Sequence, residues 1–74
     1  MSMSLEYRYN VVLSWSESDQ AFIAEVPDLA GCAADGPTYE AALEAAGVAI
    51  REWIHTTREL GRTIPKPKGR LLLV

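Results

Sequence analysis

The chain has few residues of several kinds, with one cysteine, one histidine and one phenylalanine among its 74 residues. Because Cys32 is the only cysteine, no disulfide can form within the chain, and a zinc site would need His55 and carboxylates at no recognisable spacing. No apolar run approaches the roughly 20 residues that a transmembrane helix needs, and residues 1–6 lack the features of a signal peptide. We therefore expect a cytoplasmic protein without a metal or other cofactor, in which Cys32 is a small buried residue.

Basic residues are scarce in the first part of the chain. Residues 1–50 contain eight acids and Arg8 as the only base, a net charge of −7, whereas residues 51–74 contain six bases and two acids, a net charge of +4. Since phosphate contacts supply most of the affinity for nucleic acid, the acidic part suits a basic protein partner better. One basic run is interleaved with prolines: Arg62, Lys66, Lys68 and Arg70. It has no aromatic residue for base readout, which indicates a solvated linker.

The length is that of one small domain spanning residues 1–74. A chain of this size buries only about 60% of the surface that its unfolded form exposes, so a partner or a second subunit would matter. The composition, 49% hydrophobic and 23% charged, is typical of a globular protein.

Two segments alternate between apolar and polar residues, as half-buried strands do. The first runs from Tyr7 to Trp15, with the odd-numbered residues on the core side, and the second runs over residues 21–26. The short polar segment 16–20 between them predicts an antiparallel hairpin. Pro27 ends the second strand, and residues 32–35 allow a brief third strand.

One long helix is predicted after Thr38, a plausible N-cap residue, and Gly61 is placed to end it. Gly47 inside this helix indicates close contact with the sheet. The apolar positions recur at steps of three and four residues and form one stripe: Ala42, Leu43, Ala46, Ile50, Trp53, Ile54, Thr57 and Leu60. Trp53 belongs to this stripe and Trp15 continues the apolar strand face, so we predict both in the core rather than as exposed interface anchors.

The last residues, 69–74, predict a final strand, which gives an α+β fold of two layers in the order β-β-β-α-β. This last strand is apolar on both faces and is expected to pair with the first strand, but one helix covers only one face of a sheet. The apolar residues left on the open face are Val12, Ile23, Leu71, Leu72, Leu73 and Val74. An open apolar face favours a binding site, and we expect it to hold a homodimer or a larger even-numbered homo-oligomer together.

Four carboxylates could carry chemistry or contact a partner: Asp19, Glu25, Asp28 and Asp35. Nucleases of the ribonuclease-H type hold two metals on converging carboxylates, but the first strand here supplies no acid, so a metal cluster would lack its central ligand. Turn-structuring roles and partner contacts are favoured, and we expect no enzyme activity. His55 has no nucleophile placed with it by a recognisable motif, which indicates a surface histidine in a row of charges.

Three segments in order resemble the HicB-type antitoxin family: Val26-Pro-Asp-Leu-Ala-Gly-Cys-Ala-Ala-Asp-Gly36, Thr38-Tyr-Glu-Ala-Ala-Leu43 and Glu59-Leu-Gly-Arg-Thr-Ile-Pro65. The resemblance runs from about Tyr7 to Pro67. It implies a shortened ribonuclease-H-like fold, with one helix on a four-stranded mixed sheet. It also implies a protein that binds and covers a HicA-type toxin, a messenger-RNA endonuclease, without a catalytic residue of its own.

Two other functions stay open at this stage. The chain could be an orphan oligomeric binding module of the same fold without a toxin partner, or, far less favoured, a degenerate nuclease. Many family members carry a DNA-binding segment after the last strand, whereas this sequence ends at Val74, so we expect no direct DNA binding. The sequence also departs from the family at Ala41, where an acid often completes the helix cap.

Overall fold

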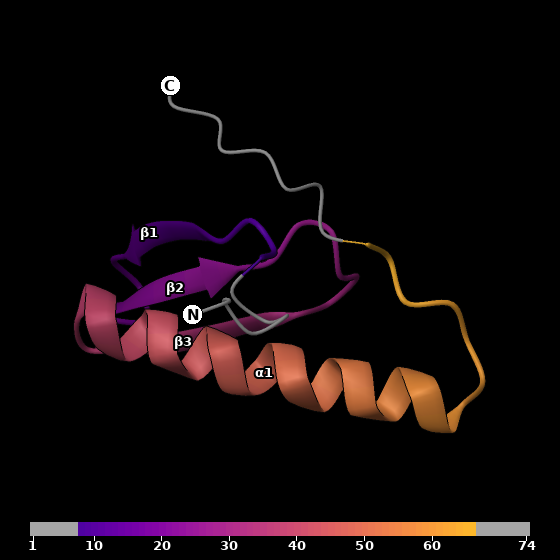
Figure 1. The fold of residues 1–74 in the computed structure, drawn as a ribbon. Helices are drawn as coiled ribbons and strands as arrows, with labels where there is room; N and C mark the ends of the chain where they lie inside the picture. The colour runs from indigo at the N-terminus through magenta and orange to yellow at the C-terminus, as the bar shows by residue number, and fades with distance from the viewer. Residues whose placement is uncertain (1–7, 67–74) are drawn as a thin grey trace, which may run out of the picture.

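A computed structural model describes residues 8–66. Its elements, in chain order, are β1 (Val12–Ser16), β2 (Ala21–Glu25), β3 (Ala33–Gly36) and α1 (Tyr39–Glu59). The strands form an antiparallel sheet in the order β1-β2-β3, and α1 lies along one face of it (Figure 1). The two-layer α+β prediction is confirmed for this part of the chain. No helix in it is long and apolar enough to cross a membrane.

The β1–β2 hairpin forms as the alternation predicts, with Val12 opposite Glu25 and Trp15 opposite Phe22. The prediction that the first strand begins at Tyr7 is wrong, because β1 begins at Val12. Tyr9 leaves the strand direction and packs into the core, where it is 4% exposed. Its hydroxyl donates a hydrogen bond of 2.5 Å to the carbonyl of Pro65. Tyr9 is thus held by core packing and by this hydrogen bond, and not by pairing with a strand.

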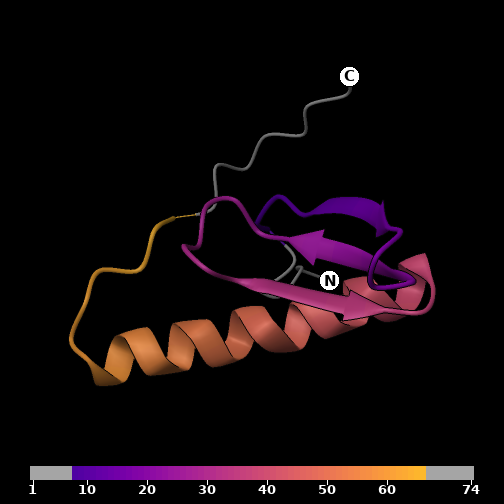
Figure 2. The ribbon, with the colours of Figure 1, turned by 180° about the vertical axis from the view of Figure 1, so that it is seen from behind.

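A tight turn leads from β2 to β3, on the far side of the sheet from the hairpin loop (Figure 2). The Val26 amide donates a hydrogen bond of 3.0 Å to the Cys32 carbonyl. Within the turn, the Leu29 amide donates to the Val26 carbonyl at 3.1 Å and the Cys32 amide donates to the Leu29 carbonyl at 3.0 Å. Gly31 adopts a φ of 74°, a conformation that costs glycine little. Leu29 is buried at the centre of the turn, so the turn belongs to the hydrophobic core as well.

Both ends of α1 are capped as the sequence predicts. The Thr38 hydroxyl accepts a hydrogen bond from the Ala41 amide at 3.0 Å, which satisfies one of the free donors of the first turn. At the other end Gly61 has a φ of 69°, and the Arg62 amide donates to the Thr57 carbonyl. This pair of features is a Schellman motif, which ends the helix and reverses the chain.

The buried stripe of α1 is narrower and shorter than predicted. It consists of Ala42, Ala46, Gly47, Ile50, Ile54 and Thr57. Leu43 and Leu60 were expected in it, but they are 42% and 61% exposed. A helix of 21 residues is about 31 Å long, whereas strands of four or five residues span about 17 Å, so α1 extends beyond the sheet it covers.

The predicted last strand, residues 69–74, lies outside the residues that the structure describes. The fourth strand, its pairing with β1 and the ribonuclease-H-like arrangement therefore stay predictions. The described sheet is antiparallel throughout and has three strands.

Candidate partner-binding surface

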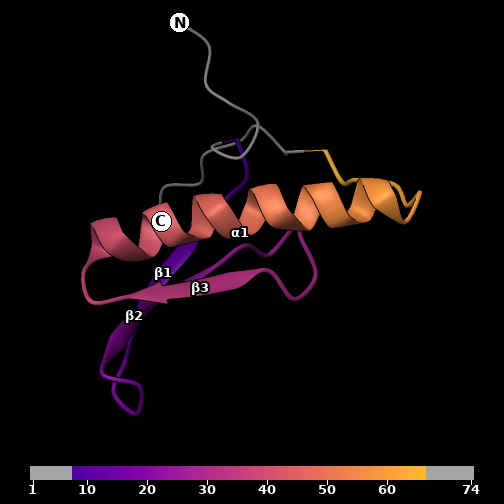
Figure 3. The ribbon, with the colours of Figure 1, turned by 90° about the horizontal axis from the view of Figure 1, so that it is seen from below.

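The sheet has one face that α1 does not cover, seen from below in Figure 3 as the side away from the helix. The strand register places eight residues on it: Val12, Ser14, Ser16, Ala21, Ile23, Glu25, Ala33 and Asp35. We call these residues the outer sheet face. Ala24, on the other face of β2, is fully buried against Ala42 and Ala46 of the helix, which fixes the direction of the pleat. Within residues 8–66, the one helix lies on the opposite side of the sheet from the outer sheet face.

The outer sheet face has an apolar centre and an acidic border. Val12 is 51% exposed, and Ile23 on the central strand is half-buried. Asp35 lies directly opposite Ile23, and Glu25 follows two residues later on the same side of β2. Both acids are exposed, and no residue of the three strands is basic. This combination suits a partner surface with apolar side chains surrounded by lysine and arginine.

Asp19 and Asp28 do not belong to this face. Asp19 lies in the hairpin loop, where its carboxylate accepts a hydrogen bond of 3.1 Å from the Ser16 hydroxyl. Asp28 lies in the turn beyond the opposite end of β2. The four acids named as partner contacts thus divide into a pair, Glu25 and Asp35, and two single residues separated by the length of β2.

Asp28 instead affects the pKa of the Tyr9 hydroxyl. Burial raises the pKa of the Tyr9 hydroxyl, the nearby Asp28 carboxylate raises it further, and Arg58 lowers it in part. The neutral phenol is the form that the hydrogen bond to Pro65 requires, since it must donate. Asp28 therefore lies near the Tyr9 hydroxyl and away from the outer sheet face.

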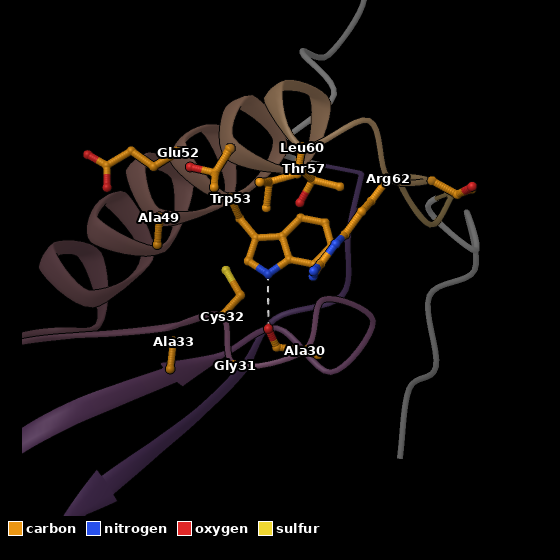
Figure 4. Close-up of a pocket in the computed structure, with 12 residues that line it drawn as sticks. Ala30, Gly31, Cys32, Ala33, Ala49, Glu52, Trp53, Thr57, Leu60 and Arg62 are labelled. Atoms are coloured by element: carbon orange, nitrogen blue, oxygen red, sulfur yellow. Dashed lines mark hydrogen bonds between the residues drawn. The ribbon is translucent and has the colours of Figure 1, made fainter.

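A groove of about 490 Å³ lies between the turn before β3 and the second half of α1 (Figure 4). Trp53 forms its wall, and its indole Nε1 donates a hydrogen bond of 2.9 Å to the Ala30 carbonyl. Trp53 also packs against the buried cluster around Ile50 and Ile54, but it is only half-buried, so its predicted core position is confirmed in part. Cys32 is buried beside it, and burial raises the pKa of its thiol, so the prediction of a small buried cysteine is confirmed.

Unlike Trp53, Trp15 does not pack against the core, and its predicted core position is wrong. It is 47% exposed, because the hairpin projects past the helix and carries its end beyond the cover of α1 (Figure 3). The ring meets Phe22 edge-on at 5.0 Å between centroids, and Phe22 in turn lies 4.3 Å from Tyr39. We call Trp15, Phe22 and Tyr39 the aromatic end. This cluster was not predicted, although Trp15 and Phe22 lie equally far from the hairpin loop, which is the signal that they pair across the strands.

The remaining titratable residues form no catalytic arrangement in the part of the chain that is described. His55 is exposed on α1 with Nε2 3.4 Å from Glu59 Oε1, the surface position expected for it. Within residues 8–66, no three histidine, cysteine or acidic side chains come together as a metal site would require.

Comparison with known proteins places this geometry in a family. A crystal structure of TTHA0281 from Thermus thermophilus has a similar fold, with a TM-score of 0.66 and 24% sequence identity over 95% of this chain and 85% of that one. None of the curated proteins matches the sequence. The family described as "HicB_like antitoxin of bacterial toxin-antitoxin system" matches residues 9–70, nearly the full length. Members of such a family act through a toxin partner, which suggests a non-enzymatic role. The chain thus belongs to the HicB-like antitoxins of bacterial toxin-antitoxin systems.

Proposed function

We propose that this antitoxin neutralises a HicA-type messenger-RNA endonuclease by binding it through the outer sheet face and covering its RNA-binding surface. The observation that carries the proposal is the apolar pair of exposed Val12 and half-buried Ile23, bordered by Glu25 and Asp35, in a chain of the antitoxin family. Covering a toxin requires no catalytic residue in the antitoxin.

Electrostatics support this choice of face. A nuclease that binds RNA presents basic side chains to phosphate, and the same side chains are attracted to Glu25 and Asp35. Opposite charges raise the association rate and orient the two proteins, whereas burial of Val12 and Ile23 supplies affinity at about 25 cal/mol per Å² before association costs are subtracted. An antitoxin bound in this way competes directly with RNA.

The test uses the product of a short, basic, histidine-containing reading frame next to the antitoxin gene. Purified toxin should cleave a labelled messenger RNA, and an equimolar amount of this chain should stop the cleavage. Ile23→Lys and the double variant Glu25→Lys/Asp35→Lys should each lose inhibition by tenfold or more, since a central apolar contact or both border charges are lost. Glu52→Lys, a single charge reversal of the same kind at an exposed position of α1, should inhibit as the unchanged chain does.

Full inhibition by the variants on the outer sheet face would move the toxin contact elsewhere. Cleavage that continues at a large excess of the unchanged chain would contradict the antitoxin proposal itself.

A second function, an oligomeric binding module without a toxin, is favoured by the 51% exposure of Val12. The outer sheet face would then hold a second copy of the chain. Sedimentation equilibrium distinguishes the two: a homodimer or a larger even-numbered oligomer that Val12→Lys dissociates would support self-association through this face. A monomer at high concentration would leave the face to the toxin.

A further inference from the structure

The aromatic end gathers half of the aromatic residues of the chain, three of six, at an exposed position. Phe22 is half-buried between its two neighbours, but Trp15 is 47% and Tyr39 59% exposed. Each comes from a different element, β1, β2 and α1, so the rings are held by the fold and not by one mobile loop. Large rings fixed in this way lose little conformational entropy when a partner covers them, which is typical of interface anchors.

The aromatic end is built from acidic segments of the chain. The two segments that build it, residues 12–22 and 36–44, contain Glu17, Asp19, Glu40 and Glu44 and no lysine, arginine or histidine. Glu17 is in direct contact with the cluster, because its Oε2 accepts a hydrogen bond of 2.7 Å from the Trp15 indole. Glu40 follows Tyr39 in the first turn of α1. Carboxylates beside the rings add to the negative potential of the ring faces.

This charge decides between the possible occupants. Aromatic platforms that stack nucleic-acid bases are accompanied by basic grooves, and here four acids would repel the phosphates. An anionic membrane surface is disfavoured for the same reason. A second copy docked about a two-fold axis would place these acids against their own equivalents, which destabilises such a contact. A cationic side chain has none of these difficulties.

We propose that the aromatic end is a docking site for an arginine-rich segment of a basic protein partner, with one guanidinium on the Trp15 ring near Glu17 and a second on the Tyr39 ring. A planar guanidinium stacks on aromatic rings and donates to carboxylates at the same time, which an ammonium group does less well. The inference deepens the proposed function and rests on it for the identity of the partner. It adds a second contact for the toxin, separate from the outer sheet face.

The probe for this site is a blocked hexa-arginine peptide added to the full chain labelled with ¹⁵N. The two tryptophans give two indole N–H signals, so Trp15 reports on the site and Trp53, hydrogen bonded to Ala30 at the other end of the molecule, is a built-in control. The peptide should shift the Trp15 signal in a saturable way and leave that of Trp53 in place. Hexalysine should bind more weakly, and hexaglutamate should cause no shift.

Variants then assign the contacts. Tyr39→Ala and Glu17→Gln should each raise the dissociation constant about three- to tenfold, in the range of a cation–π contact or a charged hydrogen bond. Glu52→Gln, which removes the same charge elsewhere on α1, should leave it within about twofold, the change expected of a distant, screened charge. Thermal unfolding should show both variants still folded at the temperature of the titration, with a slightly lower midpoint for Tyr39→Ala because it loses its contact with Phe22.

Several outcomes would overturn the inference. These are a Trp15 signal that the peptide does not move, equal affinity in Tyr39→Ala, or a stronger response to an oligothymidine or to phosphatidylcholine vesicles than to hexa-arginine. Failure of the proposed function looks different: the toxin would go on cleaving RNA in the presence of the chain while hexa-arginine still bound at Trp15. Inhibition of the toxin without peptide binding at Trp15 would retain the antitoxin function and remove this contact.

Discussion

The core of the molecule has two parts that are built from side chains of different size. Under the first half of α1 lies an alanine cluster, Ala24, Ala42 and Ala46, each fully buried. Under the second half lies a large-residue cluster of Tyr9, Val26, Leu29, Cys32, Ile50 and Ile54. Small side chains allow the helix backbone to approach the strands, whereas large ones hold it away. One helix therefore meets the sheet closely at its start and at a greater distance toward its end.

Gly36 shows how close the approach is at the alanine cluster. A Cβ atom on this residue would lie 2.6 Å from the Ala42 nitrogen, too near for any side chain. At the other part, Trp53 fills the widening space and the groove of about 490 Å³ remains. Large apolar surface is buried at the wide part, which should therefore contribute more stability, while the narrow part leaves its aromatic residues at the surface.

Removing volume from the large-residue cluster should have the largest effect. Ile50→Ala should lower the free energy of unfolding by about 2–5 kcal/mol, because Ile50 is 1% exposed and a cavity remains. Urea unfolding followed by circular dichroism measures it. Val48→Ala, on the exposed side of the same helix, is the control and should change stability by less than about 0.5 kcal/mol. Equal losses in both variants would contradict the assignment of stability to this cluster.

Adding volume to the alanine cluster should have the next largest effect. Ala46→Leu should cost about 1–3 kcal/mol, since a close helix and sheet cannot accept three more carbon atoms without moving apart. The same exchange at the half-buried Ala49, which lines the groove, should cost clearly less. Comparable urea midpoints for the two variants would show that the spacing does not differ along the helix.

The cap beside the alanine cluster should contribute less. Thr38→Ala removes the acceptor for the Ala41 amide and should lower stability by about 1 kcal/mol. Thr56→Ala is the matched control inside the same helix, where alanine has the higher helix propensity and stability should not fall. A similar loss at both positions in thermal unfolding would argue against the capping role.

The smallest effect is a change in how stability depends on pH, and it comes from Tyr9 in the large-residue cluster. Because the pKa of Tyr9 is raised in the folded state, the folded chain holds this proton more tightly than the unfolded chain. Stability from this group is complete below the unfolded pKa of about 10 and is lost as pH rises through the higher folded pKa. Tyr9→Phe should be less stable than the unchanged chain at pH near 8 and should lose less stability on going to pH near 11. Urea midpoints at the two pH values measure the difference, and parallel losses would contradict it.

Local features were predictable from the sequence because local chemistry determines them. Thr38, Gly61 and the turn after Val26 follow from capping and backbone preferences within a few residues. The periodicity of α1 likewise indicates which arc of the helix is apolar. The periodicity does not indicate which part of that arc the sheet covers. Leu43 and Leu60 were therefore predicted to be buried, although the sheet leaves them exposed.

The two proposed binding surfaces were harder to predict from the sequence than the caps and turns, because their residues come together only through strand pairing and packing. Glu25 and Asp35 are ten positions apart in the sequence, and only the pairing of β2 with β3 brings them to the two sides of Ile23. Trp15 was misplaced because alternation assigns a side chain to a face and not to a position under the helix. Whether a side chain lies under the helix is decided by the packing of α1 on the sheet, which brings together residues distant in the sequence.

The hydrogen bond from Tyr9 to Pro65 has a consequence for the order of folding. It joins residues 56 positions apart, whereas each strand of the sheet pairs with its neighbour in sequence through a short connection. The loop that the bond closes carries the highest entropy cost, so we expect the hairpin, β3 and the helix to assemble first and this link to form last. The outer sheet face and the aromatic end are then complete before it closes, so binding of a partner at either proposed surface would not depend on this final step.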